Sequence, residues 1–346
     1  MCEASQPQTI EHPTHSMKVH FVNPGHQSEN ATGMFWRNVS IAMHAAADDL
    51  NIDLVTTYAN RNHILMKQKL QQALSSDADY VIVVDEKKAL TQYFKQIENV
   101  NKPVLFIFNA PDADLLTAKP HWLSGYLTPN TFDAGYKLAH SIYKTAKERF
   151  GEQASLNLLA LYGDHRTESA LGRQHGLELF LRQHPEINLI HSDVANWSKE
   201  QGFRKSIGVL NHTPSINMIW AANDPIASGA LLAAKRANPT NLPVIGGINW
   251  DEVDAQEQAE ISVGGHVLLG AASLVLLYDA HTTQTPFPSS SNYEIFAPNS
   301  AEYQQLIDAM HTQQLGKVNF QRFSVSHEDS WQYSLLNLSK CVQNGC

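Results

Sequence analysis

The sequence has very few cysteines and no long apolar run. Only three of its 346 residues are cysteines, all near the ends of the chain, so neither a disulfide scaffold nor a zinc-ligand pattern supports the fold. The longest apolar run, around residues 270–278, still contains Ser273 and falls short of the roughly 18 residues of a membrane-spanning helix. Cys341 and Cys346 are spaced for a local disulfide in an oxidising compartment, and two free thiols are the alternative.

The sequence also lacks clusters of positive charge. Its 25 Lys and Arg residues are outnumbered by 34 Asp and Glu residues, which gives a formal net charge of -9, and no Lys/Arg-rich run occurs. A surface of this kind does not neutralise nucleic-acid phosphates or anionic lipid. We therefore expect no nucleic-acid partner and no direct insertion into a membrane.

No signal peptide is visible at the start of the chain. Residues 1–16 are polar, with acidic and histidine side chains where an apolar segment would stand. We expect a disordered tail here, and a protein that is either cytoplasmic or already freed of its signal. Cys2 is either the acylated first residue of a mature lipoprotein or an incidental cysteine in that tail.

Length and composition indicate two globular domains. A chain of 346 residues exceeds the roughly 150 residues of an average domain, and a content of 43% hydrophobic residues suffices for a sizeable core. From residue 18 onward, short apolar runs alternate with longer amphipathic segments, which is typical of repeated βαβ units. The first half has a predicted helix at 35–50 and predicted strands at 18–22, 53–58, 80–84, 103–108 and 122–127.

A second set of the same kind begins at residue 155. Its predicted strands are 156–162, 189–194, 218–221 and 243–246, and its predicted helices are 169–183, 201–211 and 225–236. The extended pieces 124–130 and 292–296 suit connections between lobes. The pattern therefore predicts an α/β fold with two doubly wound parallel-sheet lobes.

Ligands of open parallel sheets bind beyond the carboxyl ends of the strands, so the residues that follow each strand are candidates for a site. Here they are aromatic rings, amides, arginine and a few carboxylates. This set suits hydrogen bonding to a polyol held between apolar ring faces. The candidates are Phe35, Trp36, Asn109, the run 164–166, Asn223, Asp224 and the run 249–251.

Common catalytic motifs are missing from the sequence. There is no G-x-S-x-G elbow, P-loop, H-E-x-x-H or G-x-G-x-x-G. The usual sequence motifs of hydrolases, kinases, metalloproteases and dinucleotide-binding proteins are therefore absent. The 17 His residues are scattered, and we expect neither a metal site nor a cofactor. An enzyme on the same scaffold remains the competing hypothesis, with an acid–base set made of Asp164, His165, Arg166 and Asp251.

Several short motifs occur in a fixed order along the chain. They are Val22-Asn23-Pro24, Phe35-Trp36, 47–52, Pro103-Val104, 173–176, 222–230 and 245–249. With these motifs, residues 17–323 resemble the type 1 periplasmic binding proteins, the ribose- and galactose-binding family whose core is shared by LacI-type repressors. The resemblance implies two doubly wound lobes joined by a three-strand hinge.

The resemblance also implies roles for particular residues. An aromatic side chain at the Phe35 and Trp36 positions would stack on the ligand, and a second aromatic wall would come from Trp197. His266 falls near an interlobe crossing and is a further candidate. Hydrogen bonds to ligand hydroxyl groups would come from Asn109, Arg173, Asn223 and Asn249.

The chain departs from the usual sugar binders at three of the motif positions. Asn109 and Asn249 stand where many relatives have Asp, and Ala110 stands where ribose binders have Arg. Fewer carboxylates mean fewer strong, charge-assisted acceptors for ligand hydroxyls. A pentose or hexose is thus one candidate, and a furanosyl signal such as autoinducer-2 is another.

Structural roles are the alternatives for several candidates. Phe35 and Trp36 would then be core residues, and Arg173 would pair with a carboxylate, either Asp164 or Glu178. For the pair Asn223 and Asp224, we expect Asp224 to cap the following helix and Asn223 to contact the ligand.

From the resemblance we expect a periplasmic solute-binding protein without catalysis, which closes on a sugar-like ligand and presents it to an ABC permease. The alternative is the ligand-binding subunit of a membrane sensor. A LacI-type repressor would need a helix-turn-helix before Met17, and the polar segment there, with two prolines, does not suit one. The expected N-terminal lobe is 17–126 plus 267–294, the C-terminal lobe is 127–266 plus 295–330, and 331–346 is a tail.

Overall fold

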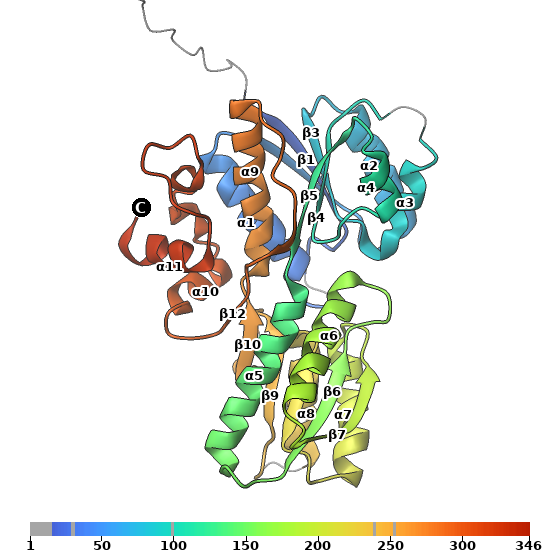
Figure 1. The fold of residues 1–346 in the computed structure, drawn as a ribbon, viewed down its shortest axis with the longest axis vertical. Coiled ribbons are helices and arrows are strands. Elements are labelled where there is room, and N and C mark those ends of the chain that lie inside the picture. The colour runs from blue at the N-terminus through green and yellow to red at the C-terminus, as the bar shows by residue number, and fades with distance from the viewer. Residues whose placement is uncertain (1–15, 29–31, 98–99, 238–239, 252–253) are drawn as a thin grey trace, which may run out of the picture.

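The computed structural model describes residues 16–28, 32–97, 100–237, 240–251 and 254–346. They form two α/β lobes, one above the other in Figure 1, each built on a six-stranded sheet. The predicted fold class is confirmed. Cys2 and all but the last residue of the predicted tail 1–16 lie outside the described residues.

The sheet of the first lobe has the strand order β11-β5-β4-β3-β1-β2, and all of its pairings are parallel. The carboxyl ends of its strands therefore meet at one edge, which faces the second lobe. The strands are β1 (Lys18–Asn23), β2 (Asp53–Tyr58), β3 (Tyr80–Val83), β4 (Val104–Ile107), β5 (Leu123–Pro129) and β11 (Ser290–Tyr293).

Helices cover both faces of this sheet because consecutive strand residues point to opposite sides. Ile82 packs with the α1 and α9 face, whereas its neighbours Val81 and Val83 pack with the α2, α3 and α4 face. The helices are α1 (Phe35–Asp49), α2 (His63–Ser75), α3 (Ala89–Phe94), α4 (Ala113–Ala118) and α9 (Leu269–Thr283), with 3-10 turns η1 (Glu86–Lys88) and η2 (His266–Leu268).

The second lobe repeats this plan with the strand order β12-β10-β9-β8-β6-β7, and only the short β12 is antiparallel to its neighbour. Trp220 is fully buried at the centre of its core. The elements are β6 (Leu156–Tyr162), β7 (Ile187–Val194), β8 (Met218–Ala221), β9 (Val244–Asn249), β10 (Ile261–Gly264), β12 (Ala297–Pro298), α5 (Thr131–Phe150), α6 (Glu168–Gln183), α7 (Lys199–His212) and α8 (Asp224–Ala237).

The chain crosses between the lobes three times, from β5 to α5, from β10 to η2 and from β11 to β12. The first and third crossings are joined by hydrogen bonds, from Asn130 N to Tyr293 O at 3.0 Å and from Asn130 Nδ2 to Glu294 Oε1 at 2.6 Å. Because β5 continues to Pro129, the first crossing lies slightly later than the predicted boundary at 126.

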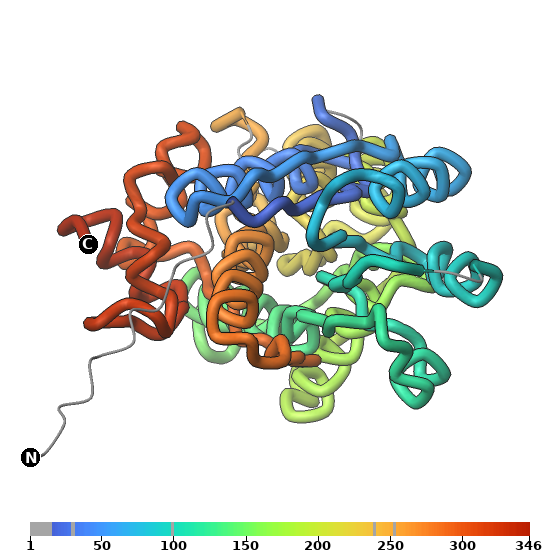
Figure 2. Tube along the Cα trace, turned by 90° about the horizontal axis from the view of Figure 1, so that it is seen from above, coloured from blue at the N-terminus to red at the C-terminus, as the bar shows by residue number. Residues whose placement is uncertain are grey.

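The C-terminal residues differ most from the predicted domain boundaries. The elements α10 (Gln304–His311), η3 (Leu315–Lys317), η4 (Phe320–Phe323) and α11 (Leu335–Asn344) lie beside α1 and α9, as Figure 2 shows. Leu306, Phe320 and Leu338 are fully buried in the core of the first lobe. The assignment of 295–330 to the C-terminal lobe holds only for its first residues, because β12 pairs with β10 there, whereas α10, η3 and η4 pack on the first lobe. Residues 331–346 are not a separate tail, because the apolar face of α11 completes the core of the first lobe.

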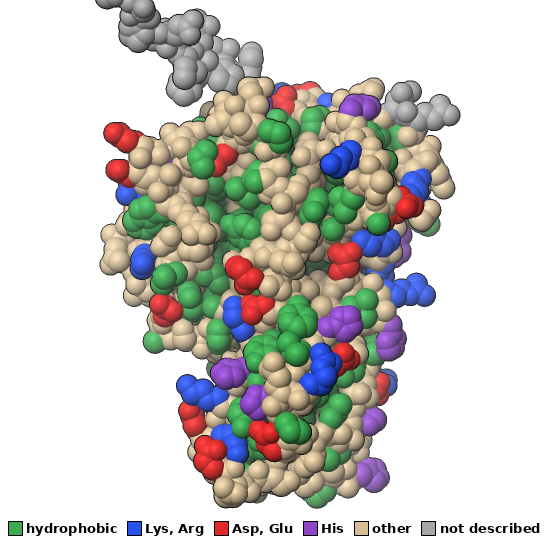
Figure 3. All heavy atoms as spheres, in the orientation of Figure 1, with side chains coloured by type: hydrophobic (Ala, Val, Ile, Leu, Met, Phe, Trp, Pro, Cys, Tyr) green, Lys and Arg blue, Asp and Glu red, His purple; other side chains and the backbone are tan. Residues whose placement is uncertain are grey.

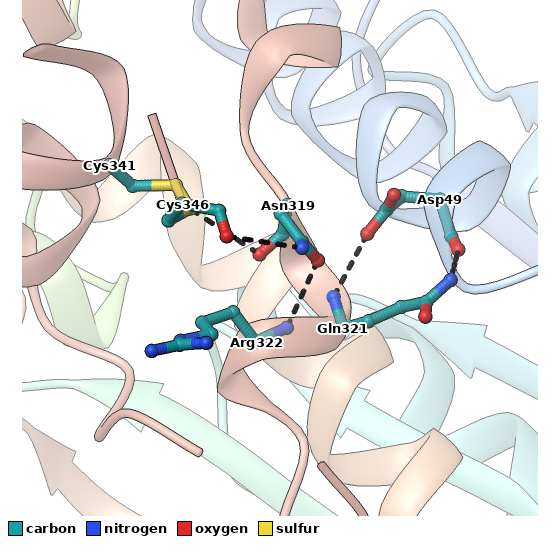
Figure 4. The surroundings of a disulfide bond; sticks show 6 residues. All are labelled: Asp49, Asn319, Gln321, Arg322, Cys341 and Cys346. Carbon is teal, nitrogen blue, oxygen red and sulfur yellow. Dashed lines mark hydrogen bonds between the residues drawn. A yellow bond between two sulfur atoms is a disulfide. The ribbon is translucent and has the colours of Figure 1, made fainter. Parts of the chain in front are cut away.

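A disulfide closes the end of this segment. Cys341 and Cys346 are bonded, with their Cα atoms 4.8 Å apart, so the first of the two alternatives for these cysteines applies. Figure 4 shows that the neighbouring Gln321 binds the end of α1, since its backbone N and its Nε2 donate to Asp49 at 2.9 and 2.6 Å. The segment is thereby fixed to the first lobe by polar contacts as well as by packing.

Hydrophobic, acidic and basic side chains are intermixed on the face of the molecule shown in Figure 3. Among the described residues, no helix has the length and apolar composition that crossing a membrane requires.

Candidate functional site

A cavity of about 80 Å³ lies where the two lobes face each other. Since one water molecule needs about 10 to 15 Å³ of such volume, roughly five to eight waters would fit, which is the size of a small ring. All eight residues to which the resemblance gives a role line this cavity, whereas the strand-end candidates 164–166, Asp224, Trp250 and Asp251 do not. The lining residues are Thr32, Phe35, Trp36, Arg61, Glu86, Phe108, Asn109, Thr167, Ser169, Arg173, Trp197, Asn223, Asn249 and His266.

Three aromatic rings of the first lobe form one wall of the cavity. Phe35 and Trp36 begin α1, and Phe108 follows β4 with a left-handed backbone at φ 66°. Their ring centroids lie 5.0 to 5.5 Å apart in edge-on contact. Asn23 fixes the start of the helix by donating from Nδ2 to Trp36 O at 2.7 Å. Phe35 and Trp36 also pack against the core, so they occupy the boundary between core and cavity.

Trp197 forms the facing wall from the second lobe. Its Nε1 donates to Asp164 Oδ2 at 2.9 Å, and its ring lies on Gly163, where an added Cβ would come within 2.4 Å of the ring. Burial acts to raise the pKa of Asp164, but hydrogen bonds from Thr167, Trp197 and Arg166 outweigh it and hold the pKa below its ordinary value. The ionised carboxylate thus fixes the orientation of the indole.

Arg173 reaches the cavity from α6 and is only 4% exposed. Its Nη1 donates to Ala222 O at 2.5 Å and its Nη2 donates to His266 Nε2 at 3.1 Å. The guanidinium also lies 5.4 Å from the ring centre of Trp197, which is a cation–π distance. Helix α5 packs closely against α6 at this point, because Gly135 of α5 has no side chain. A Cβ added to Gly135 would lie only 2.0 Å from the backbone oxygen of Arg173, so the close approach of the two helices fixes the position of Arg173.

The predicted alternative for Arg173, an ion pair with Asp164 or Glu178, is not what the structure shows. Asp164 is bonded to Trp197 and to backbone N–H groups, and Glu178 accepts a hydrogen bond from Gln174 at 2.8 Å. The side chain of Arg173 instead points to the interlobe face. A buried cation at that face is positioned to interact with whatever the cavity holds.

Burial shifts the protonation of both residues of this contact. Burial lowers the pKa of Arg173 to about 10, although the charges of Asp224 and Asp251 act to raise it. Burial also lowers the pKa of His266 well below its ordinary value, and the charge of Arg173 lowers it further. The imidazole is therefore neutral, and because its Nε2 accepts from Arg173, its proton is on Nδ1. Within the described residues, His266 Nδ1 and Arg173 Nε are buried without a hydrogen-bond partner.

The three asparagines lie at the ends of strands, as predicted. Asn109 donates from Nδ2 to Asp85 O at 3.3 Å, and Asn249 donates from Nδ2 to Asp251 Oδ2 at 2.8 Å. In both residues the amide nitrogen is thus turned into the protein. Asn223 is bonded at both ends, since its Nδ2 donates to Trp197 O at 3.3 Å and its Oδ1 accepts from a backbone N–H.

The expectation that Asp224 caps α8 was wrong. Asn223 caps α8, because its Oδ1 accepts from Ile226 N at 3.0 Å. Asp224 instead accepts from Ser262 Oγ at 2.7 Å and from Asp251 N at 2.9 Å. Asn223 still lines the cavity, but its amide is already occupied by these two local bonds.

Asp224 and Asp251 form a buried carboxylate pair behind Asn249. Burial raises the pKa of Asp224 to about 6, while burial and the charge of Asp224 raise the pKa of Asp251 to about 7. Arg173 opposes both shifts. Neither carboxylate lines the interlobe cavity; both lie on a neighbouring cavity beside α10.

Sequence reasoning missed Arg61 and Glu86, which form an ion pair at 2.5 Å on the first-lobe side of the cavity. They follow β2 and β3, so the strand-end rule would have found them had it been applied to every strand. The remaining lining residues that were missed are Thr32, Phe108, Thr167 and Ser169.

The proposed acid–base set is not assembled in the structure. Asp164 is bonded to Trp197, His165 and Arg166 are exposed, and Asp251 lies with Asp224 behind Asn249. Within the described ranges, no group of three or more His, Cys, Asp or Glu side chains is placed to hold a metal ion.

Two α/β lobes with parallel sheets, three crossings and a polar, aromatic cavity between them define a type I binding-protein fold. The chain belongs to the periplasmic binding protein family, because the family model described as a periplasmic binding protein domain matches residues 28–258. The resemblance found in the sequence is thereby confirmed.

Relatives with known ligands match part of the chain. A xylitol-binding protein of Mycolicibacterium smegmatis is 27% identical over 198 residues, which cover 57% of this chain and 53% of the relative. A D-apiose import binding protein of Actinobacillus succinogenes is 26% identical over 179 residues, 52% of this chain and 54% of the relative. The chain thus spans about half the length of these curated relatives. A solved periplasmic sugar-binding protein from Pseudomonas fluorescens has the same fold, with a TM-score of 0.78 at 24% identity, over 93% of this chain and 99% of that one.

Proposed function

We propose that this protein binds a small neutral sugar or polyol between its lobes, without transforming it, and delivers it to an ABC permease. The observation that carries the proposal is the pair of buried donors, Arg173 Nε and His266 Nδ1, which lack partners among the described residues and belong to side chains lining an aromatic-walled cavity. A buried donor without a partner costs about 1 to 3 kcal/mol, and a ligand hydroxyl oxygen offsets that cost.

Aromatic rings and uncharged amides support the same ligand class. Trp36 and Trp197 supply apolar faces from opposite lobes, which suit the C–H faces of a sugar ring. Among the lining residues, Glu86 is the one carboxylate, and it is already paired with Arg61. Binding proteins for xylitol, D-apiose and D-allose among the relatives support neutral sugars and polyols of five or six carbon atoms.

A thermal-shift screen tests the proposal directly. Xylitol, D-apiose, D-allose, L-arabinose and myo-inositol would be compared with their acidic counterparts and with amino acids. A ligand at 100 times its dissociation constant adds about 2.7 kcal/mol to stability, which is a readily measured shift. A response to neutral sugars or polyols supports the proposal. A response confined to amino acids or organic anions contradicts it.

Delivery to a permease implies a location outside the cytoplasmic membrane, in the periplasm. The family supports this part of the proposal. The lipid anchor considered for Cys2 concerns a residue outside the described part of the chain.

Closure of the lobes involves a polar contact at the rim of the cavity. Glu168 at the start of α6 accepts from Lys88 Nζ at 2.5 Å and from Ala110 N at 3.2 Å, both in the first lobe. Lys88 also donates to Ala110 O at 2.8 Å. The backbone at Ala110 thus takes part in a contact between the lobes.

Replacing Glu168 with Gln should weaken sugar binding by about two- to fivefold, because exposed ion pairs contribute about 0.2 to 1 kcal/mol. Affinity of the best ligand from the screen would be measured by calorimetry at low and high salt. Salt should weaken binding to the unchanged protein more than to the variant. Glu200→Gln is the control, since Glu200 pairs with Arg204 on α7 within one lobe. Equal losses in both variants would show that the contact does not act through closure.

A further inference from the structure

Asn249 is held at the cavity by an unusual turn at the end of β9. Its backbone φ is 153° and that of the next residue, Trp250, is 58°, both uncommon for residues with a side chain. Trp250 is anchored there, because its N donates to Ser262 Oγ at 3.1 Å and its ring packs on Tyr303. This turn brings the side chain of Asp251 back beside that of Asn249.

Contact with Asp251 decides which end of the Asn249 amide meets the cavity. An ionised carboxylate accepts hydrogen bonds but donates none, so Asn249 Nδ2 faces Asp251 Oδ2 at 2.8 Å. Asn249 Oδ1 is then left on the other side of the amide. Asp251 itself is 5% exposed and does not line the interlobe cavity, so any effect it has on a ligand passes through Asn249.

We propose that Asp251 is a positioning residue, which keeps the oxygen of the Asn249 amide toward the ligand and so selects a hydroxyl donor at that position. The inference rests on the proposed function and extends it to the chemistry of one ligand group. A ligand with a hydroxyl there gains a hydrogen bond, whereas a carbonyl or carboxylate oxygen would meet another acceptor.

The same arrangement recurs in the first lobe. Asn109 turns its nitrogen to Asp85 O at 3.3 Å, so its oxygen is also directed away from that contact. The two asparagines therefore offer acceptors from opposite lobes, while Arg173 and His266 offer donors. A polyhydroxylated neutral ligand satisfies both sets, since each hydroxyl both donates and accepts.

Protonation of Asp251 removes the preference for this orientation. A carboxyl protonated on Oδ2 donates to Asn249 Oδ1, which allows the amide nitrogen to turn to the cavity. Because the pKa of Asp251 is raised by burial and by Asp224, the second orientation becomes available as pH falls through about 7. The charged or titratable groups around Asn249 and Asp251 are Asp224 on α8, Arg173 on α6, and Asp308 and His311 on α10. From the first lobe, the uncharged Gly33 approaches Asp251.

Asp251→Asn should weaken binding of xylitol, D-apiose or D-allose about tenfold at pH 8, because the new amide can donate to Asn249 and take its oxygen from the ligand. Combining Asn249→Asp with Asp251→Asn exchanges the two groups and restores an acceptor at position 249. Affinity should then return to within about threefold of the unchanged protein. Asp254→Asn removes an exposed carboxylate from the same loop and is the control.

The side-chain amide signal of Asn249 in NMR spectra, assigned by its loss in Asn249→Asp, reports the same contact without a ligand. It should move with pH between about 5 and 8 in the unchanged protein and stay fixed in Asp251→Asn. The proposal is overturned if the Asn249 amide signal does not change with pH, or if the double variant binds the sugars no more tightly than Asp251→Asn does. If the signal titrates but none of the three sugars binds, the positioning is supported and the sugar assignment fails.

Discussion

Arg173→Ala is expected to weaken sugar binding about a hundredfold, the largest single effect on affinity in the site. The change removes a buried cation that touches Ala222 and His266 and lies over the ring of Trp197. A hundredfold loss corresponds to about 2.7 kcal/mol, within the range of arginines at the centre of binding sites. Calorimetric titration with the best ligand of the screen measures the effect.

Arg182→Ala is the matched control for this experiment. Arg182 lies in the last turn of the same helix, α6, and is exposed. Its loss removes equal charge without touching the cavity, so affinity should stay within about twofold. A loss below about fivefold in Arg173→Ala would show that the guanidinium serves the packing of the second lobe and not the ligand.

The fold was predictable because local pattern and topology agree along most of the chain. Short β-branched runs such as 80–84 lie on strands, and the apolar stripe of 35–50 lies on a helix. The sheet positions are buried on both sides, as in Val81 and Ile82, which is why these runs are continuously apolar instead of alternating.

Much of the candidate site followed from one topological rule. Parallel strands end at one edge of each sheet, and the two edges face each other, so Asn109 of the first lobe meets Asn223 and Asn249 of the second although they are far apart in sequence. Contacts across that edge could not be predicted. Whether Arg173 meets a carboxylate or an imidazole depends on side-chain directions that spacing does not give.

Neighbouring residues with similar chemistry were the hardest to assign. Asn223 and Asp224 are both good helix caps, and the choice between them is made by Ser262, which comes from another strand and binds Asp224. The C-terminal segment presents a related difficulty. Its helices have apolar faces, but the sequence does not say which lobe they complete, since both lobes precede it.

That segment carries the last prediction. Phe320→Ala is expected to lower the free energy of unfolding by about 3 to 5 kcal/mol, because Phe320 is fully buried on η4 against α1 and α9. Urea unfolding followed by tryptophan fluorescence measures it, with Phe132→Ala as the control, since Phe132 is 39% exposed and should cost below about 1 kcal/mol. If Phe320→Ala lowers the free energy of unfolding by less than about 1 kcal/mol, the C-terminal segment does not contribute to the stability of the first lobe. The expected loss would show that residues more than 200 positions beyond α1 are part of the same core, so the first lobe is complete only when the C-terminal segment has docked.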